Sequence, residues 1–382
     1  MILHIVPDEK FIDAAYRAFE AANPNNNEFV IIGKKQPLRY IKKTPIRFIG
    51  RTEFWSKKFI NSLKNYDMVC LHWLDDAKMQ LLARADTSVK FVWIGWGGDY
   101  YDLITGDTIK LLKPQTLTLS QKHRIKASSL PFKSKIKQII KRIIYKKIEK
   151  QHILNRIDFF APVIYEDYEL LLKAIPEFKP YYLAWNYGTL EDDMIKGFED
   201  HVISGNNILI GNSASYENNH LDVFEHIKPL NLSGRKIIVP LSYGDIQYRE
   251  LVASEAKMLF GEQFVSVEGF MPISEYVSML SSCYIAIMGH LRQQAVGNII
   301  IMIYLGAKVF LDKHNPVYLF FKKHHTFIYT LDEIESEIDN ALTSEEIEFN
   351  RNILRQHWSR ETIYTKTMNL IETVKQAQKV HS

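Results

Sequence analysis

The feature that most constrains this chain is a repeated alternation of short apolar segments with longer amphipathic stretches. In the first half the apolar segments cover residues 2–6, 29–32, 68–72, 91–94 and 159–163. In the second half they cover residues 208–210, 236–240, 264–267, 284–288 and 307–311. Parallel strands buried on both faces give such continuous apolar runs, and the stretches between them supply the covering helices. The sequence therefore predicts an α/β protein with two parallel sheets.

A change of pattern between the two sets of strands indicates a domain boundary. The chain has 382 residues, which exceeds the usual size of a single hydrophobic core. Residues 186–205 are acidic and rich in turn formers, so we predict an N-terminal domain over 1–190 and a C-terminal domain over 200–345. Residues 346–382 have a helical pattern, and we expect them to pack back on the N-terminal domain.

Composition excludes several classes of protein. Hydrophobic residues make up 46% and charged residues 24%, the balance of a folded chain rather than a disordered one. The two cysteines, Cys70 and Cys283, lie in strand-like runs, so we expect core thiols rather than a disulfide or a zinc site. The start of the chain lacks a signal-peptide pattern, and the longest apolar stretch, 299–307, is too short to span a bilayer. We therefore expect a cytoplasmic protein with peripheral membrane contact at most.

Residues 122–150 depart from this background because they contain eleven Lys or Arg residues and one acid, Glu149. Isoleucines recur there at helical spacing, which predicts a basic amphipathic helix. We expect this helix to lie on the anionic inner face of the cytoplasmic membrane; the alternative is a helix packed on the core with a solvated outer face. Nucleic-acid binding is disfavoured because the segment does not interleave stacking aromatic residues with its basic residues and the net charge is only +4. The candidate membrane-contacting residues are Lys137, Lys141, Arg142 and Lys146.

Three loops of the second half are candidates for a phosphate site. Each follows a predicted strand, and ligands of open α/β sheets bind at the carboxyl ends of the strands. Arg offers a planar fork that suits a phosphate, and a helix start adds free N–H groups and partial positive charge. The candidate donor-binding residues are Gly211, Asn212, Ser213, Ser242, Tyr243, Arg292, Gln293, Gln294 and Gly297. The alternatives are ordinary strand-to-helix turns and, for Arg292, a solvated surface cation.

The first half contributes candidates for acid–base chemistry. Asp99 follows a glycine-rich strand end among aromatic residues and could accept a proton from a substrate hydroxyl, and Asp8 follows the first strand. The alternative for Asp99 is a helix N-cap in a tight turn. His72, at the end of another strand, is either functional or a hydrogen-bonded structural residue. Carboxylates with metal-ligand spacing are missing from this region, so we predict no metal.

Taken together, the motifs resemble those of glycosyltransferase family 56, the 4-acetamidofucosyltransferases of the enterobacterial common antigen type. The likeness is strongest over 208–316, in "IGNSASYENNH", "VPLSYGD", "RQQAVG" and the "NP" of Asn315 and Pro316. It continues more faintly through "WIGWGGDYY" and the first strand. The basic segment 122–150 is longer than the family pattern, so the acceptor could instead be an O-antigen or capsule intermediate.

The resemblance implies a GT-B fold, with two Rossmann-like domains facing a central cleft and the nucleotide held by the C-terminal one. It further implies transfer of a sugar such as 4-acetamidofucose from a dTDP-linked donor to a polyprenyl-diphosphate-linked saccharide, without a cofactor or metal. Asp99 and then Asp8 become candidate bases, and His72, Trp96 and Tyr100 become acceptor-side candidates. Two alternatives stay open: a non-catalytic protein that binds a nucleotide-sugar or lipid-linked sugar, and a sugar-nucleotide epimerase of similar build.

Overall fold

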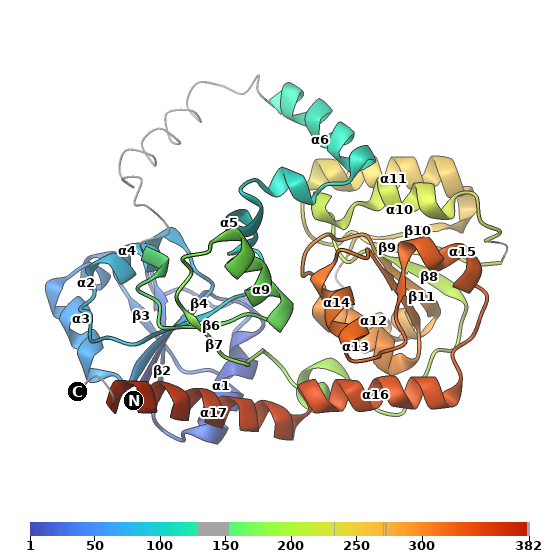
Figure 1. Ribbon diagram of the computed structural model, residues 1–382. Helices are drawn as coiled ribbons and strands as arrows, with labels where there is room; N and C mark the ends of the chain where they lie inside the picture. Colours follow the sequence, from blue (N-terminus) through green and yellow to red (C-terminus); the bar gives the residue numbers. More distant parts are fainter. Residues whose placement is uncertain (128–152, 233, 270, 272, 380–382) are drawn as a thin grey trace. The chain divides into compact units, whose positions relative to one another are not determined.

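The computed structural model describes residues 1–127, 153–232, 234–269, 271 and 273–379, and within these ranges the chain forms two compact units. The described parts of the first unit are residues 1–106, 153–193 and 358–379. Those of the second unit lie within residues 107–127 and 194–357. Each unit is an α/β body built on a single parallel sheet (Figure 1). The predicted α/β class with two Rossmann-like sheets is therefore confirmed.

The first unit has a seven-stranded sheet in the order β3-β2-β1-β4-β5-β6-β7, with every pairing parallel. Its strands are β1 (Ile2–Ile5), β2 (Asn27–Ile32), β3 (Ile46–Ile49), β4 (Met68–His72), β5 (Phe91–Ile94), β6 (Phe159–Ala161) and β7 (Tyr181–Tyr182). The strand order reverses between β1 and β4, so the loops that follow these two strands diverge at the carboxyl edge. That position is where doubly wound sheets bind ligands.

Helices cover both faces of the first sheet. They are α1 (Ile12–Ala22), α2 (Arg51–Phe54), α3 (Lys57–Ser62), η1 (Leu63–Asn65), α4 (Asp76–Arg84), α5 (Tyr101–Thr105), α9 (Tyr165–Ala174), η3 (Leu190–Met194) and α17 (Arg360–Lys379). Helices α1 and α17 lie side by side in Figure 1 and share one apolar core, to which α17 contributes Leu370, Ile371 and Val374. The indole of Trp185 adds a buried hydrogen bond of 2.9 Å to the hydroxyl of Thr367. The C-terminal helix is thus an integral part of the first unit, as predicted, whereas residues 346–357 of the same predicted segment belong to the second unit.

The second unit has a six-stranded parallel sheet in the order β10-β9-β8-β11-β12-β13. Its strands are β8 (Asn207–Ile210), β9 (Ile237–Pro240), β10 (Phe264–Val267), β11 (Cys283–Met288), β12 (Lys308–Leu311) and β13 (Tyr329–Thr330). Here the order reverses between β8 and β11. The two sheets thus repeat one topology, and each has its reversal point at the carboxyl edge.

The helices of the second unit begin with a segment that lies far away in sequence. They are η2 (Thr108–Leu111), α6 (Pro114–Ala127), η4 (Tyr216–Asn218), α10 (His220–Ile227), α11 (Ile246–Phe260), η5 (Gly261–Gln263), α12 (Ile273–Ser281), α13 (Val296–Leu305), α14 (Pro316–Lys323), η6 (Leu331–Glu333), α15 (Ile334–Glu337) and α16 (Ser344–Trp358). We expected residues 107–127 in the N-terminal domain, but they pack with the second unit. The carboxylate of Asp222 on α10 accepts hydrogen bonds from the N–H groups of Gln115 and Thr116, which ties the start of α6 to α10.

The predicted basic segment 122–150 lies outside the described residues from position 128 to its end, and so do Lys137, Lys141, Arg142 and Lys146. Within the described ranges, none of the helices combines the length and apolarity that a membrane crossing requires.

Candidate functional site

Three loops at the carboxyl edge of the second sheet bring most of the predicted donor-binding residues together. The loop after β8 carries Gly211, Asn212 and Ser213, the loop after β9 carries Ser242 and Tyr243, and the loop after β11 carries the candidates from Arg292 to Gln294. Strands β9, β8 and β11 are direct neighbours in the sheet, so these loops leave the same edge at the point where the strand order reverses.

Side-chain hydrogen bonds join the three loops directly. The amide nitrogen of Asn212 donates to the hydroxyl of Tyr243 at 2.7 Å, and the amide of Gln294 donates to Asn212 Oδ1 at 3.2 Å and to Ser215 Oγ at 3.3 Å. Asn212 and Ser213 are nearly buried, whereas the Tyr243 side chain is 48% exposed. The loops therefore form a polar surface in which Asn212 and Ser213 are held in place and the side chain of Tyr243 is accessible to a ligand.

Asn218 and His290 form a buried layer beneath this surface, and sequence reasoning missed both. Asn218 Oδ1 accepts from the Asn212 backbone N–H and from His290 Nε2, each at 2.9 Å, while its amide donates to Ser213 Oγ at 3.1 Å. Burial lowers the pKa of His290 well below its usual value, so the ring is neutral. Because its Nε2 donates to an oxygen, Nδ1 is an acceptor, and it has no hydrogen-bond partner among the described residues.

Two glycines allow the loops to approach this closely. Gly211 has φ +68°, and a Cβ there would lie 2.6 Å from His220 Nε2. Gly244 has φ +119°, and a Cβ there would lie 2.4 Å from the backbone oxygen of Ala214. The backbone N–H of Ala214 in turn donates to Tyr243 O at 2.7 Å. Both positions therefore require glycine, for reasons of backbone conformation and of space.

The start of α13 adds unsatisfied N–H groups to the same edge. Its N-cap, Ala295, has φ +57° and makes no side-chain cap, so the first turn has no internal acceptors for its N–H groups. Gly297 lies in that turn, where a Cβ would meet nothing within 4 Å. Asn315 holds the preceding loop by donating to His290 O at 2.8 Å and to Arg292 O at 3.2 Å. Arg292 is partly buried, and its guanidinium donates to the Gln293 carbonyl at 3.0 Å.

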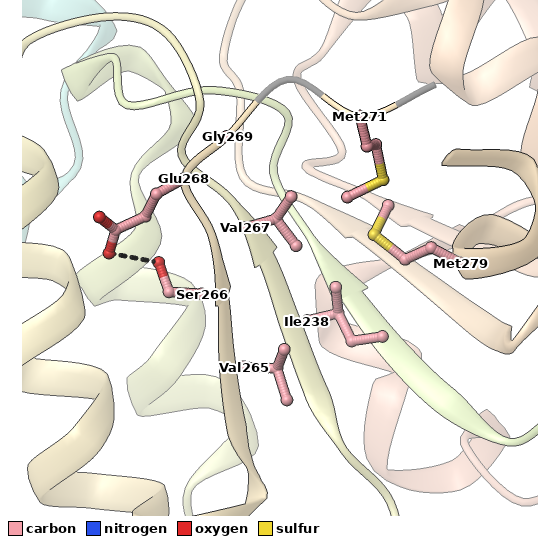
Figure 2. A pocket seen from close by; sticks show the side chains of 8 residues that line it. All are labelled: Ile238, Val265, Ser266, Val267, Glu268, Gly269, Met271 and Met279. Atoms are coloured by element: carbon pink, nitrogen blue, oxygen red, sulfur yellow. Dashed lines mark hydrogen bonds between the residues drawn. The ribbon is translucent and has the colours of Figure 1, made fainter. Parts of the chain in front are cut away.

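An apolar pocket of about 490 Å³ lies beside β10. Figure 2 shows Ile238, Val265 and Val267 on the side of the two methionine side chains, whereas Ser266 and Glu268 point to the other side of the strand. The lining residues are Ile238, Val265, Ser266, Val267, Glu268, Gly269, Met271 and Met279. Helix α12 connects this pocket to the polar loops, because it also carries Tyr276, whose hydroxyl interacts with the Asn298 side chain near the start of α13. Tyr276 is a further candidate that the sequence did not single out.

At the carboxyl edge of the first sheet, the carboxylate of Asp99 is engaged by its own surroundings. Asp99 is 9% exposed and accepts hydrogen bonds from the N–H groups of Leu74 at 2.9 Å and Trp96 at 2.8 Å, and from the Trp93 indole at 2.8 Å. Desolvation by burial raises the pKa of Asp99, and these three donors oppose the rise. Asp99 is not the N-cap of α5, a position that Tyr100 occupies. The carboxylate organises the turn between β5 and α5.

Asp8 is engaged in a similar way. Its oxygens accept hydrogen bonds from the backbone N–H groups of residues 39–41 at 2.6–3.1 Å, and Asp13 on α1 accepts from those of residues 42–44 at 2.8–3.1 Å. The two carboxylates together fix the loop between β2 and β3. Desolvation by burial would raise the pKa of each, but the hydrogen bonds outweigh it and hold both pKa values below the ordinary range.

This arrangement predicts an acid-sensitive loop. A carboxyl whose pKa is lowered by folding stabilises the fold fully above its unfolded pKa of about 3.9 and loses that contribution as the pH falls through the lower folded value. We expect hydrogen-exchange protection of amides 39–44 to stay constant from neutral pH to about pH 5 and to fall below about pH 4. Asp8→Asn should weaken protection of amides 39–41 already at pH 7; unchanged protection in that variant would contradict the assignment.

The remaining first-unit candidates differ in accessibility. His72 is fully buried and contacts His4 through its Nε2 at 3.0 Å and the Tyr187 hydroxyl through its Nδ1. Tyr100 is also fully buried and donates to Asp167 at 2.5 Å, so its ring belongs to the core. Trp96 is partly exposed and donates its indole N–H to Tyr187 at 2.7 Å. Of the three predicted acceptor-side residues, Trp96 is the one that a ligand can reach directly.

Residues 190–355 match the family described as 4-alpha-L-fucosyltransferase glycosyl transferase group 56. The matched stretch contains all three donor-side loops and the whole second sheet.

Solved glycosyltransferase structures resemble the chain over its whole length. Sucrose-phosphate synthase from Thermosynechococcus elongatus superposes with a TM-score of 0.61 at 10% identity, covering 98% of this chain and 99% of that chain. A glycosyltransferase from Rickettsia africae gives 0.59 at 14% identity, with 98% of each chain covered. Anabaena HepE, solved in complex with UDP and glucose, gives 0.59 at 11% identity, covering 98% of this chain and 99% of that chain. These similarities establish the GT-B fold, and together with the family match they support a hexosyltransferase.

Proposed function

We propose that this chain transfers a sugar from a nucleoside diphosphate donor to a polyprenyl-diphosphate-linked saccharide at the inner face of the bacterial cytoplasmic membrane. The donor that we propose is dTDP-linked 4-acetamidofucose or a similar deoxyamino sugar, and the match to a fucosyltransferase family supports a fucose-type sugar. One observation carries the proposal: three loops of the second unit converge, through the Asn212, Tyr243 and Gln294 hydrogen bonds, at the uncapped start of α13.

The chemistry of sugar transfer fits this edge. The acceptor hydroxyl oxygen forms a bond to the anomeric carbon and releases its proton to solvent. The bond from that carbon to the β-phosphate oxygen breaks, and the nucleoside diphosphate leaves with added negative charge. Free N–H groups at the start of α13 and the guanidinium of Arg292 would stabilise that charge without a metal ion. The neighbouring apolar pocket beside Val267 and Met279 would receive the flat base of the nucleotide.

The acceptor side of the proposal rests on the first unit. The carboxylates of Asp99 and Asp8 already accept hydrogen bonds from groups within the unit. We therefore propose that they hold the acceptor-side loops in shape and do not remove the proton of the acceptor hydroxyl. Trp96 would then contact the acceptor directly, and His72 would act through Tyr187.

Calorimetric titration with dTDP, UDP, GDP and CMP tests the donor site. Arg292→Ala should weaken binding of the preferred nucleoside diphosphate by roughly 10- to 100-fold, since a hydrogen bond to a charged group contributes about 1.5–3 kcal/mol. Lys257→Ala is the matched control: it also removes one positive charge from the second unit, but from the last turn of α11, where Lys257 pairs with Glu262.

Each outcome of the titration has a clear meaning. Preference for dTDP, lost in Arg292→Ala and kept in Lys257→Ala, would support the donor proposed. An unchanged affinity in Arg292→Ala would remove Arg292 from the site. Failure of the wild-type chain to bind any of the four nucleotides would overturn the transferase proposal, whereas conversion of the donor sugar in the absence of an acceptor would favour an epimerase.

A further inference from the structure

Four aromatic rings gather at the carboxyl edge of the first sheet, each in a segment that follows a different strand. We call Phe11, Trp73, Trp96 and Tyr187 the aromatic cluster; they follow β1, β4, β5 and β7. The ring of Trp96 lies at the centre, with centroids 5.6–5.7 Å from the other three at interplanar angles of 65–87°. Phe11 is 39% exposed, and the other three rings are partly exposed. The cluster therefore faces solvent at the edge where such sheets bind ligands.

The polar side-chain atoms of Trp96 and Tyr187 make hydrogen bonds within the unit. The indole N–H of Trp96 donates to Tyr187 Oη at 2.7 Å, and this hydroxyl also bonds to the buried His72, which contacts His4 at 3.0 Å. Burial lowers the pKa of His4 to about 3 and that of His72 well below its usual value, so the chain of groups is uncharged at neutral pH. A ligand can therefore contact the ring of Trp96, whose orientation is fixed by the hydrogen bond from its indole N–H to Tyr187.

Backbone strain at Trp73 also points to a ligand site. Trp73 has φ +63°, a left-handed conformation that is a genuine outlier for a bulky side chain. Its ring fills the space beside Gly98, where a Cβ would lie 2.7 Å from Trp73 Cη2. Such strain costs about 1–3 kcal/mol and concentrates at functional sites, where the surrounding structure maintains it.

The shape and rim of the cluster favour a sugar ring over an alkyl chain. The edge-to-face rings present separate flat faces, whereas a prenyl chain requires a continuous apolar trough. The rim is polar: the Lys10 ammonium lies 5.2 Å from the Phe11 ring centroid, and the neighbouring Glu9 is partly exposed. A pyranose has one apolar C–H face that stacks on an aromatic ring and an edge of hydroxyls that charged rim groups can bind.

We propose that the aromatic cluster is a saccharide-stacking subsite for the acceptor, with Trp96 as the contacting platform and Tyr187 and His72 as positioning residues. The proposal rests on the proposed transferase function and specifies which part of a lipid-linked acceptor the first unit recognises: its sugar, through a C–H face.

Saturation-transfer NMR on the full chain tests the subsite, with N,N′-diacetylchitobiose, cellobiose, maltose and farnesyl phosphate as separate probes. We expect saturable transfer to at least one disaccharide, strongest at the protons of one pyranose face. Trp96→Ala should weaken that binding by roughly tenfold, in line with the energy of an aromatic contact. Tyr187→Phe keeps the ring but removes the hydroxyl that holds Trp96 and contacts the buried His72, so it should lower the melting temperature as well. Measured at a temperature where the variant is still fully folded, disaccharide binding should be several-fold weaker. Tyr181→Ala is the control, since Tyr181 is 73% exposed on β7 and lies outside the cluster.

Transfer to farnesyl phosphate but to none of the disaccharides would overturn the proposal, and so would disaccharide binding that survives Trp96→Ala, or no disaccharide binding at all. Calorimetry with nucleoside diphosphates on the same preparations reports the donor site separately. A chain that binds nucleotide but no sugar would therefore refute the subsite alone, and a chain that binds sugar but no nucleotide would refute the transferase function alone.

Discussion

Replacing Gly244 by alanine is expected to lower the free energy of unfolding of the second unit by roughly 3 kcal/mol and to abolish nucleotide binding. The new Cβ would lie 2.4 Å from the Ala214 carbonyl oxygen, a backbone atom that cannot turn away as a side chain can. The loops after β8 and β9 must then separate, which breaks the hydrogen bonds from Ala214 N to Tyr243 O and from Asp245 N to Ala214 O. Tyr243 and Asn212 would lose the relative position on which the donor site depends.

Gly234→Ala separates this effect from the ordinary cost of a positive φ. Gly234 has φ +73° in the same unit, but a Cβ there would meet nothing within 4 Å. We expect Gly234→Ala to lower the free energy of unfolding by about 1 kcal/mol, because the left-handed conformation is unfavourable for alanine, and to leave nucleotide affinity unchanged. Urea denaturation and calorimetry on both variants provide the comparison. Equal destabilisation in the two, or normal nucleotide binding in Gly244→Ala, would show that the paired loops do not form the site.

Most strands that the sequence predicts are buried on both faces; the exception is β10, an edge strand whose four residues are partly buried but form an apolar run interrupted only by Ser266. Strands β4 and β11 read as nearly uninterrupted apolar runs because helices cover both sides of each sheet. The three strands that were not predicted, β3, β7 and β13, are outermost in their sheets. Strand β3 carries the exposed Arg47 between apolar neighbours, and β7 and β13 have two residues each, so none of them produces an apolar run.

The donor loops could be predicted because parallel strands bring all their carboxyl ends to one edge. That rule places Asn212, Tyr243 and Gln294 at the same edge without any knowledge of their contacts. The rule does not predict the buried layer that Asn218 and His290 form beneath these loops. Asn218 lies in a short 3₁₀ turn and reaches His290, 72 positions away, and that contact depends on how two loops fold over each other.

For the carboxylates at strand ends, the sequence could not distinguish a catalytic base from a structural residue. Asp8 and Asp99 both follow strands and both lie at the expected edge, which is also true of catalytic bases in this architecture. What separates a base from a structural residue is whether backbone N–H groups converge on it. For Asp8 those donors come from a loop about thirty positions away, and for Asp99 one comes from Leu74 on the neighbouring strand's loop. The residues next to Asp8 and Asp99 in the sequence do not predict either set of hydrogen-bond donors.

Asp99→Asn decides between the two roles. We expect it to lower the free energy of unfolding of the first unit by about 2–4 kcal/mol, because the new NH₂ group must face an N–H donor in a buried site and leave that donor unpaired. If Asp99 is instead a catalytic base without a structural role, Asp99→Asn should leave the free energy of unfolding unchanged. The rate at which nucleoside diphosphate is released in the presence of donor and acceptor should then fall by about 10²- to 10⁴-fold. Asp76→Asn, an exposed aspartate in the first turn of α4, should change stability by less than about 0.5 kcal/mol.

The same variant also connects Asp99 to the aromatic cluster. One oxygen of Asp99 accepts the backbone N–H of Trp96 at 2.8 Å and the other accepts the indole of Trp93, so the carboxylate sets the turn from which the Trp96 ring projects. If the cluster binds the acceptor sugar, Asp99→Asn should weaken saturation transfer to the disaccharide while nucleotide affinity in the second unit stays at the wild-type value. Loss of nucleotide binding as well would mean that the change unfolds the chain, and normal stability with normal sugar binding would return Asp99 to the list of candidate bases.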